Sequence, residues 1–283
     1  MKRVAFLGPA GTYSADALGA AAAGEEVERM PVATIFGAIQ AVAEGAADRA
    51  LVPFENSIEG SVRSTLDTLA FEVDDVVIAG EHDHPIVHSL IAGRELALGE
   101  IAVVLSHPQA SAQCARFIRE RLPNAEVRSA DSTADAVRTV AASGERWAAL
   151  GAASAAALHG GVVLREGVED EPDNVTRFVW IAPLGAEPAG AGPWRTTLIF
   201  SELGADHPGA LVEALQEFAE HDVNLTRIES RPLRQGLGRY MFFLDVEGPL
   251  ADEPVAAAIE ALRGKAENVR VLGSYPVGAP GVP

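Results

Sequence analysis

A threonine and an arginine stand next to each other where an apolar segment begins, in the run from Asp173 to Ile181. Thr176 offers a hydroxyl and Arg177 a guanidinium, while residues 178–181 have the apolar character of a buried strand. A strand that holds both groups rigidly would suit a small anionic substrate that loses an oxygen. Because Thr-Arg-Phe also occurs by chance in strands, the meaning of this triplet depends on the other polar junctions of the chain.

A glycine-rich turn with hydroxyl groups follows the first apolar segment, at residues 8–14, which include Thr12. The free N–H groups at the start of the next helix would favour an anion there. The turn has neither the Gly-Lys-Ser/Thr of a phosphate-binding loop nor the spacing Gly-x-Gly-x-x-Gly. A plain tight turn remains the alternative.

Four polar side chains crowd the junction at residues 52–61, namely Glu55, Asn56, Ser57 and Ser61. Capping of a helix or turn would explain Asn56 or Ser57 alone. It does not readily explain all four, so we expect groups that grip a carboxylate or a hydroxyl.

A similar junction contains Ser106, His107, Gln109 and Gln113. The two glutamines are one helical turn apart and therefore share a face. Ser106 beside His107 would suggest a hydrolase, but neighbouring residues rarely form a Ser–His pair. The nucleophile motif Gly-x-Ser-x-Gly is also absent, and we therefore set the hydrolase interpretation aside.

Three histidines, His82, His84 and His88, lie close together in the sequence, with Glu81 and Asp83 among them. This spacing would allow a metal site, since alternate residues of a strand point to one face. A proline and an apolar run between His84 and His88 favour a strand over a helix. Ordinary surface or core histidines are the commoner outcome, and we predict no metal.

Composition excludes several classes of protein. The 283 residues carry a net charge of −18 and no basic stripe, which argues against binding to nucleic acid or anionic membranes. High acidity can also be an adaptation to solubility or high salt. The single cysteine, Cys114, rules out an internal disulfide and a cysteine metal cluster, and its helical surroundings predict a packing role. With no secretion signal and no run of about 18 apolar residues, we expect a cytoplasmic protein.

Short apolar runs alternate with helical patterns through the first 180 residues or so. Strands are predicted at residues 4–7, 50–53, 101–105 and 147–150, with Thr34 and Ser132 as helix N-caps. A single helix is predicted from about residue 107 to 121. Alternation of this kind predicts βα units around mostly parallel sheets, with a ligand site beyond the carboxyl ends of the strands.

A second module follows a segment rich in glycine, proline and alanine at residues 184–194. Its apolar patterns give strand, helix, strand, strand, helix and strand in that order. This is the βαββαβ arrangement of a ferredoxin-like domain. A domain of this size commonly pairs its sheets or helices with a twin.

Together these segments resemble the prephenate dehydratase family. The matching motifs are residues 6–14, 53–57, 106–109 and 174–178. Residues 207–212 and 224–232 are similar to the phenylalanine-binding signatures of the family's regulatory ACT domain. The resemblance implies an α/β fold with a two-lobed catalytic domain, similar to type II periplasmic binding proteins, and a C-terminal ferredoxin-like ACT domain. We accordingly expect the catalytic domain at residues 1–183, a linker at 184–194 and the ACT domain at 195–276.

The resemblance also implies an activity. The family converts prephenate to phenylpyruvate, with loss of water and carbon dioxide, in phenylalanine biosynthesis, and it needs no metal or organic cofactor. L-Phenylalanine is implied as an allosteric effector bound between ACT domains, and self-association as a dimer or tetramer. Arogenate dehydratase is a near alternative that the sequence does not separate, and a ligand sensor without catalysis is a more distant one.

The site residues implied by the resemblance fall into three groups. The catalytic residues are Thr176, Asn56, Gln113 and Ser106. The substrate-binding residues are Arg177, Glu55, Ser57, Thr12 and Phe178. The phenylalanine-binding residues are Gly209, Ala210, Leu211, Val212, Asn224, Leu225, Glu229, Ser230, Arg231 and Pro232.

The chemistry of the reaction limits what Thr176 can do. The difficult step is stabilising the departing hydroxide, and threonine is a poor acid. We therefore expect Thr176 to donate a strong hydrogen bond while water or a carboxylic acid such as Glu55 supplies the proton. Arg177 could pair with a substrate carboxylate, or it could form a structural ion pair with Asp170 or Glu171.

Overall fold

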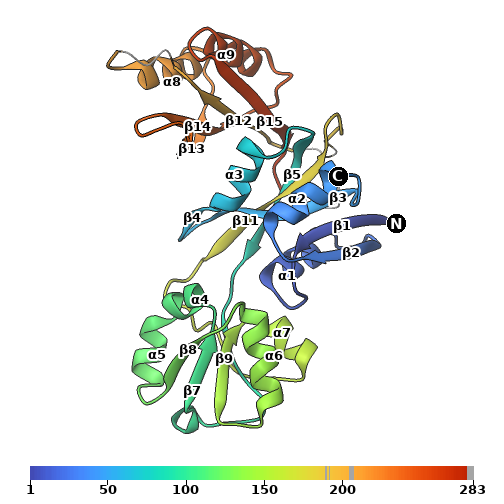
Figure 1. The fold of residues 1–283 in the computed structure, drawn as a ribbon, viewed down its shortest axis with the longest axis vertical. Coiled ribbons are helices and arrows are strands. Elements are labelled where there is room, and N and C mark those ends of the chain that lie inside the picture. Colours follow the sequence, from blue (N-terminus) through green and yellow to red (C-terminus); the bar gives the residue numbers. More distant parts are fainter. Residues whose placement is uncertain (189, 191, 204–206, 279–283) are drawn as a thin grey trace.

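The computed structural model describes residues 1–188, 190, 192–203 and 207–278. Three parts follow one another along the long axis of the molecule (Figure 1). The N-terminal lobe lies in the middle, a second lobe lies at one end, and the C-terminal domain lies at the other.

The first lobe is built on a six-stranded sheet with the order β2-β1-β3-β11-β5 and the short β4 paired to β3. Its strands are β1 (Lys2–Leu7), β2 (Val27–Val32), β3 (Arg49–Asn56), β4 (Gly60–Ser61), β5 (Val76–Pro85) and β11 (Val175–Pro183). Its helices are α1 (Tyr13–Ala21), α2 (Ile35–Ala43) and α3 (Arg63–Phe71). Thr34 caps α2 as predicted, because its hydroxyl accepts the N–H of Gly37. Leu18 and Trp180 are buried on one face of the sheet, and Ile39 and Leu66 on the other.

The second lobe has a five-stranded sheet with the order β10-β6-β9-β7-β8. Its strands are β6 (Ser89–Ala92), β7 (Val103–Ser106), β8 (Glu126–Ser129), β9 (Trp147–Gly151) and β10 (Val162–Glu166). Its helices are α4 (Pro108–Gln113), α5 (Ala115–Arg121), α6 (Thr133–Ser143) and α7 (Ala153–His159), with a 3-10 turn η1 (Leu98–Glu100). Ser132 caps α6 as predicted.

Two sequence predictions about these lobes are wrong. Both sheets are mixed rather than mostly parallel, since β11 runs antiparallel to β3 and β5, and β6 runs antiparallel to β9 and β10. The reason is that the chain crosses between the lobes twice, after β5 and after β10. The first strand after each crossing, β6 and then β11, runs antiparallel to both of its neighbours in the sheet that it enters. The helix expected over residues 107–121 is broken at Cys114, whose φ of −116° and ψ of 19° end α4 and begin α5.

Cys114 is fully buried, as predicted. Burial raises the pKa of its thiol to about 12, and the carboxylates of Glu169 and Asp170 act in the same direction. The thiol therefore stays protonated at neutral pH and serves as packing between the two helices.

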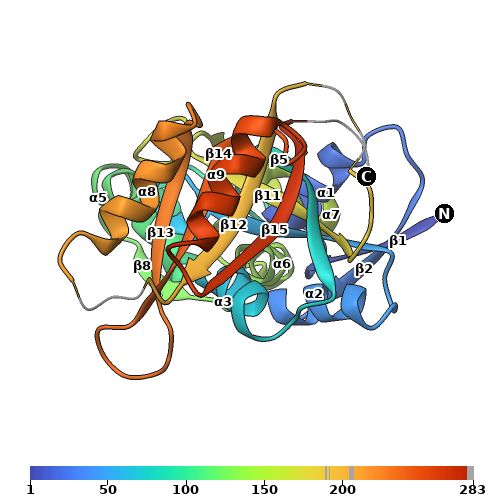
Figure 2. The ribbon, with the colours of Figure 1, turned by 90° about the horizontal axis from the view of Figure 1, so that it is seen from above.

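The C-terminal domain has the predicted βαββαβ order. Its elements are β12 (Trp194–Ser201), α8 (Ala210–Glu220), β13 (Leu225–Pro232), β14 (Tyr240–Glu247), α9 (Glu253–Arg263) and β15 (Asn268–Pro276). The four strands form an antiparallel sheet with the order β13-β14-β12-β15. Both helices cover one face of it (Figures 1 and 2).

The other face of that sheet packs on the first lobe and shares its hydrophobic core. Phe243, Leu272 and Tyr275 join the cluster that contains Ile39 and Leu66. The approach is close, because a Cβ at Gly273 would lie 2.1 Å from the carbonyl oxygen of Ile78. The expected α/β fold with two lobes and a ferredoxin-like domain is thus confirmed. No helix in the described ranges is long and apolar enough to cross a membrane.

Candidate active site

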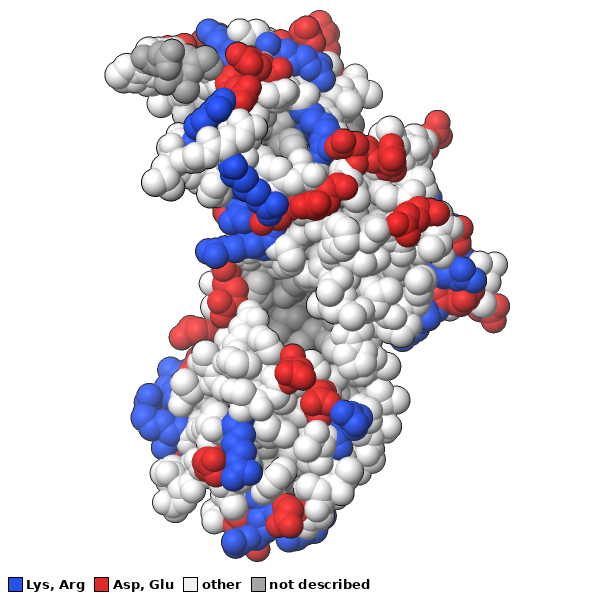
Figure 3. Space-filling view, in the orientation of Figure 1, with Lys and Arg blue, Asp and Glu red and all other residues white. Residues whose placement is uncertain are grey.

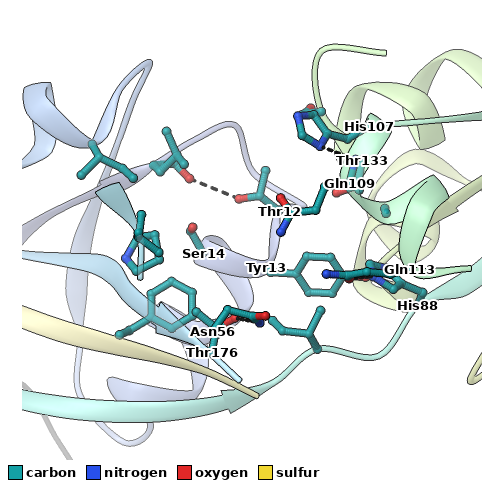
Figure 4. A pocket seen from close by; sticks show the side chains of 18 of the residues that line it. Thr12, Tyr13, Ser14, Asn56, His88, His107, Gln109, Gln113, Thr133 and Thr176 are labelled. Atoms are coloured by element: carbon teal, nitrogen blue, oxygen red, sulfur yellow. Dashed lines mark hydrogen bonds between the residues drawn. The ribbon is translucent and has the colours of Figure 1, made fainter. Parts of the chain in front are cut away.

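A cleft of about 440 Å³ lies between the two lobes, where the surface is hollowed (Figure 3). Its lining comes from both lobes and from both crossing segments (Figure 4). The polar side chains that line it belong to Thr12, Tyr13, Ser14, Asn56, His88, His107, Gln109, Gln113, Asp131, Ser132, Thr133, Asn174 and Thr176. No lysine or arginine belongs to this lining among the residues described.

Helix N-termini supply much of the polar character of the cleft. Thr12 caps α1, and its hydroxyl accepts the N–H of Ala15 at 3.3 Å. Ser132 caps α6 by accepting the N–H of Asp135 at 3.0 Å. Both caps line the cleft, so the positive ends of two helix dipoles are directed toward it from opposite lobes.

The hydrogen bonds of Asn56 establish which of its neighbours in the cleft are donors and which are acceptors. Its Oδ1 accepts the backbone N–H groups of Ile58 at 3.0 Å and Glu59 at 2.9 Å. A backbone N–H can only donate, so Oδ1 is an acceptor and Nδ2 carries the two protons. Nδ2 then donates to Asn174 Oδ1 at 2.7 Å and to Thr176 Oγ1 at 2.9 Å.

The hydroxyl of Thr176 is therefore poised as a donor. Its oxygen already accepts a hydrogen bond from Asn56, and the side chain lines the cleft. The hydroxyl proton remains available to a group bound there. The direction of the hydrogen bond between Asn56 and Thr176 follows from the amide of Asn56 and does not depend on an ionised neighbour.

The same chain of donors continues across to the second lobe. Asn174 Nδ2 donates to Gln113 Oε1 at 3.2 Å, and Gln113 Nε2 donates to Glu59 Oε1 at 3.1 Å. Gln113 Oε1 also lies 2.9 Å from His88 Nε2, and His88 Nδ1 lies 2.7 Å from the hydroxyl of Tyr13. The first lobe, both crossing segments and α4 thus meet in one polar network (Figure 4).

His88 is expected to make the protein's stability depend on pH. Burial lowers the pKa of His88, and this effect outweighs the opposing influence of Gln113 and Glu169. The unfolded chain, with an ordinary value of about 6.5, then binds more protons below that pH. The contribution of His88 is fully present above about pH 6.5 and is lost as pH falls toward the folded-state pKa.

Urea denaturation between about pH 7.5 and about pH 5.5 measures this effect, which is at most about 1.4 kcal/mol per pH unit for one histidine. His88→Gln removes the titrating ring and is the matched control. The variant should lose part of the pH dependence, while His82 and His84, whose pKa values burial also lowers, contribute equally in both proteins. Identical pH profiles would contradict the prediction.

Arg177 and Glu55, which were expected to bind substrate, do not line this cleft. Successive residues of a strand point to opposite faces, so Thr176 faces the cleft and Arg177 faces the C-terminal domain. Arg177 is buried and forms ion pairs with Asp245 at 2.6 Å, Glu55 at 3.0 Å and Glu81 at 3.3 Å. Neither Asp170 nor Glu171, the structural partners considered from sequence, is among them. Glu55 is also paired with Arg227 at 3.6 Å, outside the cleft lining.

Ser57 and Ser106 also lie outside the cleft lining. Ser57 Oγ accepts the N–H of Val175 at 3.0 Å and so holds the start of β11. With Glu55 and Arg177 it borders a separate cavity against the C-terminal domain. Ser106 is fully buried, and its hydroxyl donates to the carbonyl oxygen of Leu150 at 2.8 Å. Both serines position backbone segments near the site and make no direct contact with it. Thr12, Asn56, Gln113, Thr176 and Phe178 do line the cleft.

Sequence reasoning missed Tyr13, His88 and Asn174 as site residues. Tyr13 and Asn174 lie inside the recognised motifs, and attention to every polar residue of those motifs would have found them. His88 was considered only as a metal ligand with His82 and His84. The rings of His82 and His84 do lie near each other, 6.0 Å between centroids. No group of three His, Cys, Asp or Glu side chains that could hold a metal ion occurs among the residues described.

The expected phenylalanine site divides between two elements of the C-terminal domain. Gly209, with a φ of 103°, is the N-cap of α8, and Ala210, Leu211 and Val212 begin that helix. Residues 224–232 precede and form β13, which is an edge strand of the sheet. Gly209, Ala210 and Leu211 border a cavity with Tyr240 and Phe242. Arg231 instead pairs with Asp67 of α3 at 2.7 Å, across the contact with the first lobe.

Comparison with known proteins gives consistent matches along the chain. A family model described as prephenate dehydratase matches residues 4–185, and a model described as ACT domain matches residues 197–264. A prephenate dehydratase of Mycobacterium tuberculosis is 42% identical over 287 residues, which cover 98% of this chain and 88% of the relative.

Two solved structures resemble the whole molecule. One is a prephenate dehydratase from Arthrobacter aurescens in complex with L-Phe, with 39% identity, a TM-score of 0.88, and coverage of 99% of this chain and 92% of that one. The other, GqqA, is described as a novel type of quorum quenching acylase. It has 33% identity, a TM-score of 0.84, and coverage of 98% of both chains.

Proposed function

The chain belongs to the prephenate dehydratase family, and from this premise we propose which of its residues carry out the reaction. The protein is a carbon–oxygen lyase that converts prephenate to phenylpyruvate with loss of water and carbon dioxide, in L-phenylalanine biosynthesis. Its C-terminal ACT domain makes it subject to allosteric regulation by L-phenylalanine. We take residues 1–183 as the catalytic domain and 195–276 as the ACT domain.

Thr176 is proposed to stabilise the departing hydroxyl group. As the ring carboxylate leaves as carbon dioxide, the electron pair of its C–C bond enters the ring, and the C–O bond to the ring hydroxyl breaks. A donor aimed at that oxygen lowers the barrier by stabilising the charge that develops on it. The observation that supports this role is the hydrogen bond from Asn56, which leaves the Thr176 proton free.

The proton that completes the departing water comes from solvent in this proposal. Glu55, the carboxylic acid considered from sequence, is held by Arg177 and Arg227 outside the cleft. Thr176 donates a hydrogen bond and keeps its proton, because a threonine alkoxide would be too costly.

Helix N-termini are proposed to receive the two carboxylates of prephenate. Among the residues described, the cleft lining offers no lysine or arginine, so the positive ends of α1 and α6, with the hydroxyls of Ser14 and Thr133, are the available partners. Their positions on opposite lobes would allow each to receive one of the two carboxylates, the one on the ring and the one on the pyruvyl side chain, which both branch from the ring carbon opposite the hydroxyl. This arrangement also keeps a permanent positive charge away from the carboxylate that must leave as neutral carbon dioxide.

The remaining expectations concern assembly and location. We propose that the protein acts in the cytoplasm and self-associates as a dimer or tetramer through its ACT domains. The exposed edge strand β13 and the exposed side chains of Val212 and Ile228 support an association there. Phenylalanine would then bind between residues 209–212 of one protomer and 224–232 of its partner.

Turnover of prephenate by the purified protein, with and without L-phenylalanine, tests the function. We expect phenylpyruvate to form and L-phenylalanine to suppress it. Arogenate tested alongside separates the two dehydratase substrates. Absence of turnover with both would overturn the assignment.

An acylase assay should be included because of the likeness to GqqA. We expect no amide hydrolysis, because no described serine or cysteine side chain is hydrogen-bonded to a histidine that could activate it. Hydrolysis that survives Thr176→Val would point to a second activity in the cleft.

A further inference from the structure

The amide of Gln113 is held in one of its two possible orientations. Its Oε1 faces two nitrogen atoms, His88 Nε2 at 2.9 Å and Asn174 Nδ2 at 3.2 Å, and its Nε2 faces Glu59 Oε1 at 3.1 Å. Turning the amide over would set its NH₂ against the NH₂ of Asn174 and its carbonyl oxygen against the carboxylate of Glu59. The observed orientation leaves one N–H of Nε2 unused by these partners.

The orientation of Gln113 also determines the tautomer of His88. Oε1 has no proton to give, so His88 Nε2 must be the donor. In a neutral imidazole Nδ1 is then an acceptor, and the hydroxyl of Tyr13, 2.7 Å away, is the donor within reach. The same hydroxyl lies 3.1 Å from the carbonyl oxygen of Val87, so its single proton is shared between that oxygen and the nearer Nδ1. The Tyr13 ring stands edge-on to the imidazole, with centroids 5.4 Å apart and an angle of 83° between planes.

His88 is well placed to hold this arrangement. It lies on the first crossing segment between the lobes and is only 2% exposed. Its backbone N–H donates to Glu169 Oε2 at 2.9 Å, on the second crossing segment. Tyr13 of the first lobe and Gln113 of the second lobe thus hold the imidazole ring, and Glu169 holds the backbone of His88.

We propose that His88 is a positioning residue of the dehydratase reaction, acting as a neutral imidazole protonated at Nε2. It makes Gln113 present an N–H, and not a carbonyl lone pair, to the dianionic substrate. Tyr13 supports it by fixing the tautomer. This inference rests on the proposed function and on the further proposal that Gln113, which lines the cleft, contacts the substrate.

The physical consequence is a difference in substrate affinity. A carbonyl oxygen turned toward a carboxylate would repel it, whereas an N–H attracts it. In metal sites, loss of a group that orients a ligand typically costs about 10- to 100-fold, and we expect a loss of this size by analogy. We expect this loss mainly in KM, because the contact is made in the bound substrate as well as in the transition state.

A comparison of two amide variants of His88 tests the proposal. A glutamine places its amide nitrogen near the position of Nε2, and an asparagine places it near that of Nδ1. His88→Gln should keep the donor to Gln113 and a kcat/KM within about threefold of wild type. His88→Asn should lose about 10- to 100-fold, chiefly through KM. Equal losses in two equally stable variants would overturn the proposal.

Gln113→Leu separates this inference from the function on which it depends. If Gln113→Leu leaves kcat/KM unchanged, Gln113 does not contact substrate and its proposed role fails. If it impairs turnover while the two His88 variants behave alike, only the proposal for His88 fails. In the double variant His88→Asn, Gln113→Leu, the second change should add little, since both remove one contact.

Nitrogen NMR of the histidine rings measures which ring nitrogen of His88 carries the proton. A merely structural role would not require one particular nitrogen to be protonated. At neutral pH the His88 signal, assigned by its absence in His88→Gln, should show Nδ1 unprotonated and Nε2 protonated. Tyr13→Phe should change the Nδ1 signal and introduce the other tautomer. A charged ring or an Nδ1-protonated ring in the wild-type protein would overturn the proposal.

Discussion

Replacing Thr176 with valine should lower kcat for prephenate by about 10²- to 10³-fold, which is the usual cost of removing one donor to a developing oxyanion. Valine has nearly the shape of threonine and lacks only the hydroxyl. The side chain is 8% exposed and packs in strand β11, so valine should preserve the fold. The variant leaves Asn56 one hydrogen bond short, but Asn174 still accepts from Nδ2. Steady-state kinetics with prephenate measure the loss.

Thr176→Ser is the matched control, because it keeps the hydroxyl and should retain activity within about tenfold of the wild type. KM should change little in either variant if the hydrogen bond forms mainly as the hydroxyl departs. A valine variant with a normal thermal transition and near-normal kcat would contradict the role of Thr176.

Replacing Asp245 with alanine should lower the free energy of unfolding by about 3–5 kcal/mol, the usual cost of removing one partner from a buried ion pair. Asp245 is fully buried in β14 of the ACT domain. It accepts hydrogen bonds from Arg177 at 2.6 Å and Thr197 at 2.8 Å. Without it, the buried guanidinium of Arg177 would keep Glu55 and Glu81 as its anionic partners among the residues that the structure describes. Urea and thermal denaturation measure the change.

Asp74→Ala is the control, because Asp74 also pairs with the ACT domain, through Arg270, but its side chain is 88% exposed. An exposed pair of this kind contributes about 0–1 kcal/mol. Equal, small effects of the two variants would show that the buried network does not hold the domains together. If Asp245→Ala left the stability unchanged, binding of a substrate carboxylate by Arg177 would again become a hypothesis to test.

Local sequence patterns correctly predicted the features that depend on neighbours in the chain. Thr34 and Ser132 cap helices because a cap needs only its own side chain and the next turn of backbone. The apolar run from Tyr240 to Val246, interrupted only by Asp245, forms β14. The ordered motifs identified a family, and the expected cleft residues Asn56, Gln113 and Thr176 do meet in one pocket.

The roles of the charged residues beside these motifs were decided by tertiary structure. Arg177 and Glu55 adjoin Thr176 and Asn56 in sequence, and proximity in the chain suggested a common site. The register between β3 and β11 shifts at this point, and both charged side chains lie on the side of the ACT domain. Sequence shows that neighbouring strand residues face opposite ways. It does not show what covers each face.

The sequence alone thus determined the family, the helix and strand pattern of each domain, and the residue types of the reaction. Only the tertiary structure decided that the cleft lining has no lysine or arginine among the described residues, that Glu55 is paired with Arg177 and Arg227, and that His88 meets Gln113. The reason is physical. Motif residues are set by local backbone geometry and reaction chemistry, whereas the partner of a buried charge or imidazole comes from segments that meet only when the lobes and the ACT domain pack together.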